Sequence, residues 1–196
     1  MTVDEELPNI EVFMARPDLS GLPKHELPVG YSIRVYQPGD EAAWVRIHEL
    51  ADRYNKVTLE TFQAEFGYDL DSFRARGFFL IAPNGETVGT ASAWYDNEFE
   101  GETWGRVHWV AIRPEHQGKG LSKPLLARVL HRLAEDHSKC YLVTSSARIP
   151  AISLYLKFGF RPLMRTQTCS LAWDSVKGKI PNSYSMLLNP ARGTPL

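Results

Sequence analysis

The sequence has very few cysteines and no metal-binding spacing. Only Cys140 and Cys169 occur among its 196 residues, and they do not form a CxxC pair. Two cysteines are too few for a disulfide framework, and their spacing does not match a zinc site. We therefore expect no metal and two reduced, buried or half-buried thiols in a cytosolic protein.

The sequence also lacks a charge excess and a long apolar run. Its formal net charge is −1, so no global field favours nucleic acid or an anionic membrane. No apolar stretch approaches the length of a membrane span. The first residues, MTVDEELPNIEVFM, are acidic and do not resemble a signal peptide. These absences predict a soluble cytoplasmic protein with no nucleic-acid or membrane partner.

What is present is the composition of an ordinary globular domain, 43% hydrophobic and 23% charged. Residues 1–30 contain several prolines and no sustained period, which predicts an extended arm docked on the domain or on a partner. Residues 31–196 are assigned to one domain. The sequence does not determine the oligomeric state and is compatible with a homodimer.

The apolar pattern predicts an alternation of strands and helices. Strands are expected at residues 31–37, 77–82, 87–95, 104–113 and 140–146, and the Asn84-Gly85 turn predicts a hairpin. Helical spacing is seen after Asp40, at residues 59–66 and onward, after the glycines near residue 120, and at 150–160. TCSLAW (168–173) and SYSMLL (183–188) are read as strands. The order predicts an α/β domain with a mixed sheet.

The turn between the fourth expected strand and the next helix contains two glycines. QGKGLS, residues 117–122, opens a helix whose first N–H groups are unpaired and carry partial positive charge. Gly118 and Gly120 let an anion approach the backbone, and nearby cationic side chains add charge: Arg113, His116, Lys119 and Lys123. Ser122 is a candidate cap. The alternative is a turn that uses glycine only for its geometry.

Two motifs together resemble the GNAT superfamily of N-acetyltransferases. QGKGLS is similar to that family's Q/R-x-x-G-x-G/A turn, with Gln117 and Gly120 matching and Ser122 replacing the last small residue. Downstream, AISLYLKFGF resembles the family's A-x-x-x-Y-x-x-x-G-F helix, with Tyr155 in register. One departure is Arg148, where the family often has Asn. The resemblance implies a mostly antiparallel sheet with helices on both faces.

The resemblance also implies acetyl-CoA as co-substrate and assigns its contacts. The pyrophosphate would lie on Gln117, Gly118, Lys119, Gly120, Leu121 and Ser122, and the thioester on the backbone of Val110, Ala111 and Ile112. Tyr155 would protonate the departing thiolate. From helical spacing alone, a core position is the favoured interpretation of Tyr155.

The residue that deprotonates the amine is less clearly indicated. His108 lies two residues before Val110, so on a regular strand both side chains share a face. Its ordinary pKa, near 6.5, suits a base at neutral pH, although a β-bulge could turn it away and a satisfied core histidine is the alternative. Glu102, acting directly or through water, is the second candidate, and an ordered water without a dedicated base is the third.

Two further groups of residues are candidates for binding the acceptor. The alternating carboxylates of DNEFEGE could attract a cationic amine, although such a run is more often a solvated hairpin loop. Aromatic side chains could line an acceptor pocket or belong to the core: Tyr54, Tyr68, Trp94 and Trp104.

The resulting hypothesis is an acyltransferase that moves acetyl from acetyl-CoA to a primary amine by direct transfer in a ternary complex. The expected acceptor is a small molecule, with a protein N-terminus or lysine as the alternative. A non-catalytic acyl-CoA-binding sensor is a hypothesis of a different class, because fold alone does not give function.

Overall fold

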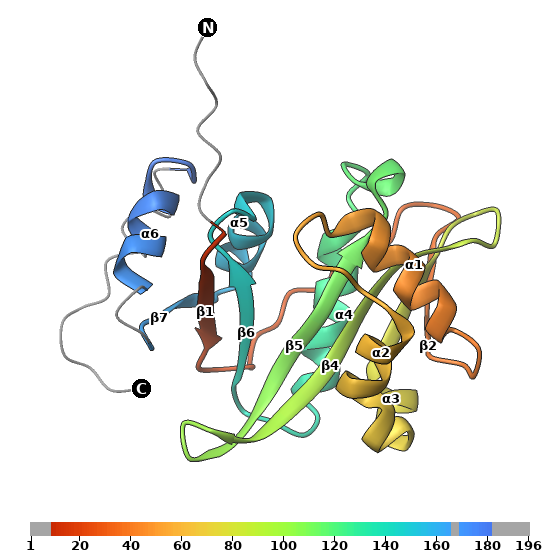
Figure 1. The fold of residues 1–196 in the computed structure, drawn as a ribbon, viewed down its shortest axis with the longest axis horizontal. Helices are drawn as coiled ribbons and strands as arrows, with labels where there is room; N and C mark the ends of the chain where they lie inside the picture. Colours follow the sequence, from red (N-terminus) through yellow and green to blue (C-terminus); the bar gives the residue numbers. More distant parts are fainter. Residues whose placement is uncertain (1–8, 166–168, 182–196) are drawn as a thin grey trace, which may run out of the picture. The chain divides into compact units, whose positions relative to one another are not determined.

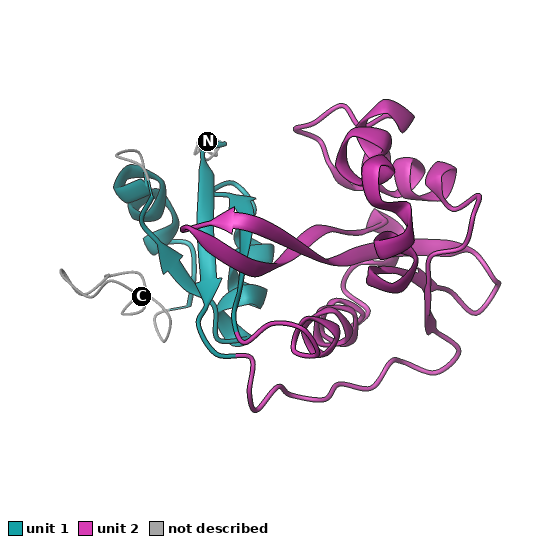
Figure 2. Ribbon diagram, turned by 90° about the horizontal axis from the view of Figure 1, so that it is seen from below, with its two compact units in different colours: residues 1–18, 139–196 teal, residues 19–138 magenta. Residues whose placement is uncertain are grey.

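The computed structural model describes residues 9–165 and 169–181, which belong to two compact units. Residues 19–138 form one unit, and residues 1–18 with 139–196 form the other (Figure 2). We call them the central unit and the terminal unit. Each is described by itself. The expected boundary at residue 30 is not tested by this division and stays a prediction.

The central unit contains an antiparallel sheet with strand order β2-β3-β4-β5. The strands are β2 (Ser32–Val35), β3 (Gly77–Ile81), β4 (Thr87–Phe99) and β5 (Glu102–Ile112). The predicted Asn84-Gly85 hairpin joins β3 to β4, and Gly85 adopts φ +85°, which glycine adopts without steric cost. Figure 2 shows β4 and β5 as a long twisted hairpin.

Helices cover both faces of this sheet. Helices α1 (Glu41–Ala51), α2 (Leu59–Phe66) and α3 (Leu70–Arg76) lie on one side of the β4–β5 hairpin, and α4 (Ser122–Leu133) lies on the other (Figures 1 and 2). A short 3-10 turn, η1 (Gly67–Asp69), joins α2 to α3. The expected α/β class, with mostly antiparallel strands and helices on both faces, is confirmed.

An aromatic core forms between helices α1 to α3 and the sheet. Trp44, Phe62, Phe66 and Phe73 are fully buried, and the Phe66 and Phe73 ring centroids are 4.2 Å apart. Large aromatic side chains contribute more to the stability of such a core than other apolar side chains do. The helical spacing of Phe62 and Phe66 places both rings on one face of α2, and this face packs against the sheet.

The ends of α1 and α2 are capped differently. Asp40 holds the N-cap position of α1, as expected, but its side chain makes no capping bond. It instead accepts two hydrogen bonds from Arg34, at 2.6 and 2.7 Å, and one from the Gln37 N–H. Thr58 and Thr61 form a reciprocal capping box that starts α2.

The terminal unit contains three antiparallel strands in the order β6-β1-β7. They are β6 (Cys140–Ser145), β1 (Glu11–Arg16) and β7 (Arg161–Leu163). Helix α5 (Ile149–Lys157) ends near Gly159, which adopts φ +83°. The segment expected as an extended arm thus includes a strand paired on both edges, a pairing that the sequence pattern does not reveal.

The prediction of a strand at TCSLAW is wrong. Residues Cys169–Lys177 form helix α6, whose buried residues recur at helical spacing: Cys169, Ala172, Trp173 and Val176. This apolar stripe packs against β1, so tertiary burial favours the helix. The strand expected at 183–188 lies outside the described residues. Both cysteines are buried, as expected.

The carboxylate run of residues 96–102 is also mostly strand, where the sequence favours a solvated loop. Strand β4 continues to Phe99, β5 begins at Glu102, and only Glu100 and Gly101 make the turn.

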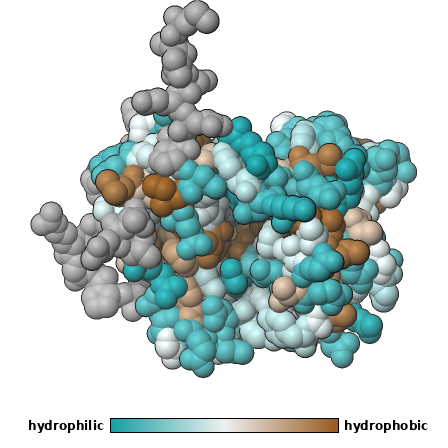
Figure 3. All heavy atoms as spheres, in the orientation of Figure 1, coloured by the Kyte–Doolittle hydropathy of each residue, from teal (hydrophilic) through white to brown (hydrophobic). Residues whose placement is uncertain are grey.

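On the face drawn in Figure 3, hydrophilic residues predominate over the central unit, and hydrophobic ones form small separate groups. Within the described residues, no helix is long and apolar enough to cross a membrane.

Candidate active site

A β-bulge interrupts β5 next to the expected thioester contacts. Ser92 pairs with His108 and Thr90 pairs with Ala111, so Trp109 and Val110 together oppose the single residue between the two β4 partners. Trp109 adopts φ +48°, an uncommon conformation for a residue with a large side chain. A bulge leaves backbone groups outside the regular ladder and re-aims the side chains around it.

The bulge breaks the regular alternation on which the expected shared face of His108 and Val110 depends. His108 and the adjacent Trp109 instead both contact the helices beside the sheet. The His108 ring lies 5.8 Å from that of Phe66 in α2, and the Trp109 ring lies 5.0 Å from that of Trp44 in α1. The extra residue breaks the two-residue period on which the sequence argument relied.

The glycine turn after β5 is open to an approaching anion. Gly118 and Gly120 adopt φ +74° and +78°, and a Cβ built on either would meet no atom within 4 Å. The Gln117 side chain donates a hydrogen bond of 2.8 Å to the Ile112 carbonyl, which ties the turn to the end of β5. The two glycines thus provide backbone that a bulky oxyanion can reach.

The start of α4 carries no side-chain cap. Leu121 occupies the N-cap position and is buried, whereas Ser122 is the first helical residue, so the expected cap at Ser122 does not form. Pro124 falls in the first turn, where a missing N–H costs no intrahelical bond. The remaining amides and the helix dipole favour an anion at this end.

The cations around the turn divide into two groups. Arg113 pairs with Glu115 at 2.5 Å and with Glu86 at 3.9 Å, and the His116 Nδ1 lies 3.0 Å from the Tyr31 hydroxyl. Lys119 and Lys123 are exposed beside the glycines. The two lysines are therefore the better placed of the expected cations for a phosphate.

His108 is buried and bonded to a carboxylate. Its Nε2 lies 2.7 Å from Oε2 of Glu65, near the end of α2. Burial lowers the pKa of His108 from 6.5 to about 4, against the opposing effect of Glu65. The hydrogen bond with His108 lowers the pKa of Glu65. At neutral pH the pair is thus a neutral imidazole beside a carboxylate, rather than a histidine titrating near 6.5.

The other two expected catalytic residues are Glu102 and Tyr155. Glu102 is exposed at the start of β5, six positions before His108, which corresponds to roughly 20 Å along an extended strand. The structure therefore does not bring Glu102 to His108. Tyr155, in α5 of the terminal unit, is buried against Phe160, with the ring centroids 5.8 Å apart. Burial raises the pKa of Tyr155 to about 12, so the phenol stays protonated.

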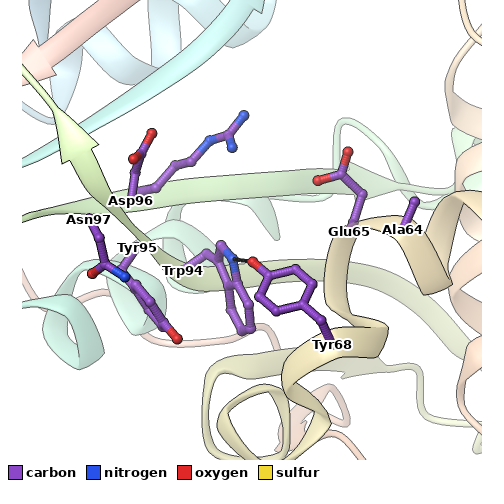
Figure 4. A pocket seen from close by; sticks show the side chains of 8 residues that line it. Ala64, Glu65, Tyr68, Trp94, Tyr95, Asp96 and Asn97 are labelled. Atoms are coloured by element: carbon purple, nitrogen blue, oxygen red, sulfur yellow. Dashed lines mark hydrogen bonds between the residues drawn. The ribbon is translucent and has the colours of Figure 1, made fainter.

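A polar hollow of about 320 Å³ lies between α2 and the β4–β5 hairpin. Figure 4 shows Glu65 and Ala64 from α2 at one end, Asp96 and Asn97 from β4 at the other, and Tyr68 between them. The Trp94 indole donates a hydrogen bond of 3.2 Å to the Tyr68 hydroxyl. The full lining is Ala64, Glu65, Tyr68, Trp94, Tyr95, Asp96, Asn97 and Arg106.

Only some of the residues that are candidates for binding the acceptor line the hollow. Tyr68 and Trp94 line it, whereas Tyr54 and Trp104 do not. Asp96 alone represents the acidic run. Glu65 and Arg106 were missed, because a single charged residue beside aromatic core positions gives no signal in the sequence. Among the described residues, no group of three or more His, Cys, Asp or Glu side chains could hold a metal ion.

Comparisons with known proteins agree with this arrangement. The model of the acetyltransferase (GNAT) family matches residues 44–160. Mycothiol acetyltransferase of Streptomyces bingchenggensis is 31% identical over 166 residues, covering 82% of this chain and 52% of the relative. The Streptomyces griseus protein of the same name is 34% identical over 142 residues, covering 68% and 44%. This chain thus spans about half the length of these relatives.

Solved structures show the same fold. The GCN5-related N-acetyltransferase from Sphaerobacter thermophilus superposes with a TM-score of 0.65 at 22% identity, covering 78% of this chain and 48% of that one. The match to the family model includes the bulge, the glycine turn and α4. The chain therefore belongs to the GNAT family of acetyltransferases.

Proposed function

We propose that this protein transfers acetyl from acetyl-CoA to a primary amine of a small molecule, directly and within a ternary complex. The observation that carries the proposal is the bulge at Trp109 and Val110, which is followed by the open glycine turn at the start of α4. The bulge leaves backbone N–H groups outside the regular strand ladder, and the glycine turn presents backbone N–H groups to a phosphate.

The coenzyme contacts proposed from the sequence fit these local features. The turn residues from Gln117 to Ser122 would hold the pyrophosphate, with Lys119 and Lys123 as exposed cations. The backbone from Val110 to Ile112 would face the thioester. There an N–H group would stabilise the negative charge that develops on the thioester oxygen.

The proton transfers require a base and an acid. In the proposed reaction, His108 takes the proton that leaves the amine as its nitrogen bonds to the acetyl carbon. The carbon–sulfur bond then breaks, and the thiolate receives the phenol proton of Tyr155. Both groups start in the required state, because burial keeps His108 neutral and Tyr155 protonated near pH 7.

The relatives narrow the acceptors to be tested first. Those cited above are named mycothiol acetyltransferases, so the panel includes mycothiol and its deacetylated amine. The polar lining of the hollow supports a hydrophilic acceptor, because its hydroxyl, amide and charged groups need partners when water leaves. Aminoglycosides, polyamines, amino acids and peptide N-termini complete the panel.

Acetyl-CoA-dependent thiol release across this panel tests the function. We expect release with one class of small amine. With that amine, Tyr155→Phe should lower kcat by about 10²-fold or more while the Kd for acetyl-CoA stays unchanged. Acetyl-CoA binding without release by any amine would contradict the proposal and favour a sensor module. Release with peptides alone would shift the acceptor to proteins.

A further inference from the structure

Glu65 bridges the proposed base and the hollow. One carboxylate oxygen lies 2.7 Å from the His108 Nε2, and the same side chain lines the hollow, where it is about one-third exposed. His108 itself is not part of that lining and is only 10% exposed. Glu65 therefore contacts both the hollow and His108.

The contact defines which nitrogen of His108 carries the proton. A carboxylate can only accept hydrogen bonds, so with Glu65 ionised the hydrogen must reside on Nε2. The neutral ring then has its lone pair on Nδ1. The rings of Phe66 and Trp109, each 5.8 Å from the imidazole, further restrict its orientation. Glu65 thus fixes both the tautomer and the direction of the basic nitrogen.

We infer that Glu65 is the positioning residue of the catalytic base: it holds His108 as the Nε2–H tautomer, so that Nδ1 accepts the proton of the amine. When Nδ1 is protonated, the ring becomes an imidazolium whose Nε2–H still points at the carboxylate. The new positive charge then lies against a negative one in a buried position, which stabilises it. This inference rests on the proposed function.

The first test is Glu65→Gln, which keeps the shape of the side chain and removes its charge. With the amine identified in the panel, we expect kcat to fall by about 10²-fold, because acid–base groups contribute on that order. The Kd for acetyl-CoA should not change. Glu60→Gln is the matched control, since it removes the same charge from an exposed position on the same helix. It should leave kcat unchanged.

The pH profile separates positioning from a structural role. The charged groups that act on His108 are Glu65, which raises its pKa, and Arg106, which lowers it. Removing the carboxylate should therefore move the acidic limb of kcat/KM to lower pH. Glu65→Asp, which retains the charge, should restore part of kcat. A purely structural defect would reduce the active fraction without moving the limb.

A double mutant and an NMR measurement complete the test. If Glu65 acts through His108, Glu65→Gln combined with His108→Gln should lose no more kcat than His108→Gln alone. The ¹⁵N shifts of His108 should report the Nε2–H tautomer in the unsubstituted protein and a mixture in Glu65→Gln. Unchanged kcat and an unchanged tautomer in Glu65→Gln would overturn the inference. Absence of turnover with every amine would contradict the proposed function, and the NMR result would still decide whether Glu65 sets the tautomer.

Discussion

At the scale of single residues, the site depends on backbone conformations that side chains rarely adopt. Trp109 has φ +48° in the bulge, and Gly118 and Gly120 have φ above +70° in the turn. Only the glycines adopt this region without steric cost, so Trp109 must be held there by its packing on Trp44 and His48. Such positions are typical of functional sites.

We predict that Gly120→Ala raises the Kd for acetyl-CoA at least tenfold. Isothermal titration calorimetry measures this change. A methyl group would occupy space meant for a phosphate oxygen, and φ +78° would cost the alanine roughly 1 kcal/mol of folding stability. Gly101→Ala is the control, because its φ is +79° and its Cβ also meets no atom, yet it lies in the β4–β5 turn. Equal losses of affinity in both variants would contradict the assigned phosphate site.

At the scale of elements, α2 has two roles on neighbouring faces. Its buried residues, Phe62 and Phe66, attach the helix to the aromatic core, and Glu65 reaches His108. The position of Glu65 therefore depends on the packing of the residue next to it. A helix that shifted on the sheet would lose the contact with His108.

We predict that Phe66→Ala lowers the free energy of unfolding by about 3–5 kcal/mol, measured by urea denaturation. The ring is fully buried, and removing it would leave a cavity among its aromatic neighbours: Trp44, Phe62, Phe73, Trp94 and His108. Leu59→Ala, on the same helix but 51% exposed, should change stability by less than about 0.5 kcal/mol. Similar losses in the two variants would refute the packing assigned to α2.

The helices and strands also show which elements local sequence patterns predict and which they do not. Helix α4, the Asn84-Gly85 hairpin and α2 follow directly from spacing and turn chemistry, and all three are present. Helix α6 was predicted as a strand because its short apolar run fits either period until a partner surface is known. Strand β1 gave no signal because proline-rich flanks obscured a six-residue segment.

At the scale of the whole molecule, buried histidines should set the acid stability. The pKa of His108 is about 4 in the folded protein and near 6.5 when unfolded, so between these values the unfolded state binds more protons. Stability should therefore fall as the pH drops from about 6.5 to 4. The upper limit of this loss is roughly 3 kcal/mol. Ionised Glu65, whose pKa is also lowered, acts in the same direction below its unfolded value.

Urea denaturation at pH 7 and pH 4.5 measures this effect. His108→Gln should reduce the difference in unfolding free energy between the two pH values. Burial lowers the pKa of His137 as well, and because His137 is partly exposed, His137→Gln should reduce the difference less. An unchanged difference in His108→Gln would show that His108 is not the neutral buried group described above.

The sequence by itself determined the family, the glycine turn and the candidate acid and base, because these depend on residue types at short, fixed spacings. Tertiary structure alone decided what surrounds them. The bulge turned His108 and Trp109 toward the same helices, and the packing of α2 placed Glu65, 43 positions away, against His108. Contacts across such separations arise from packing between elements, which no local period encodes.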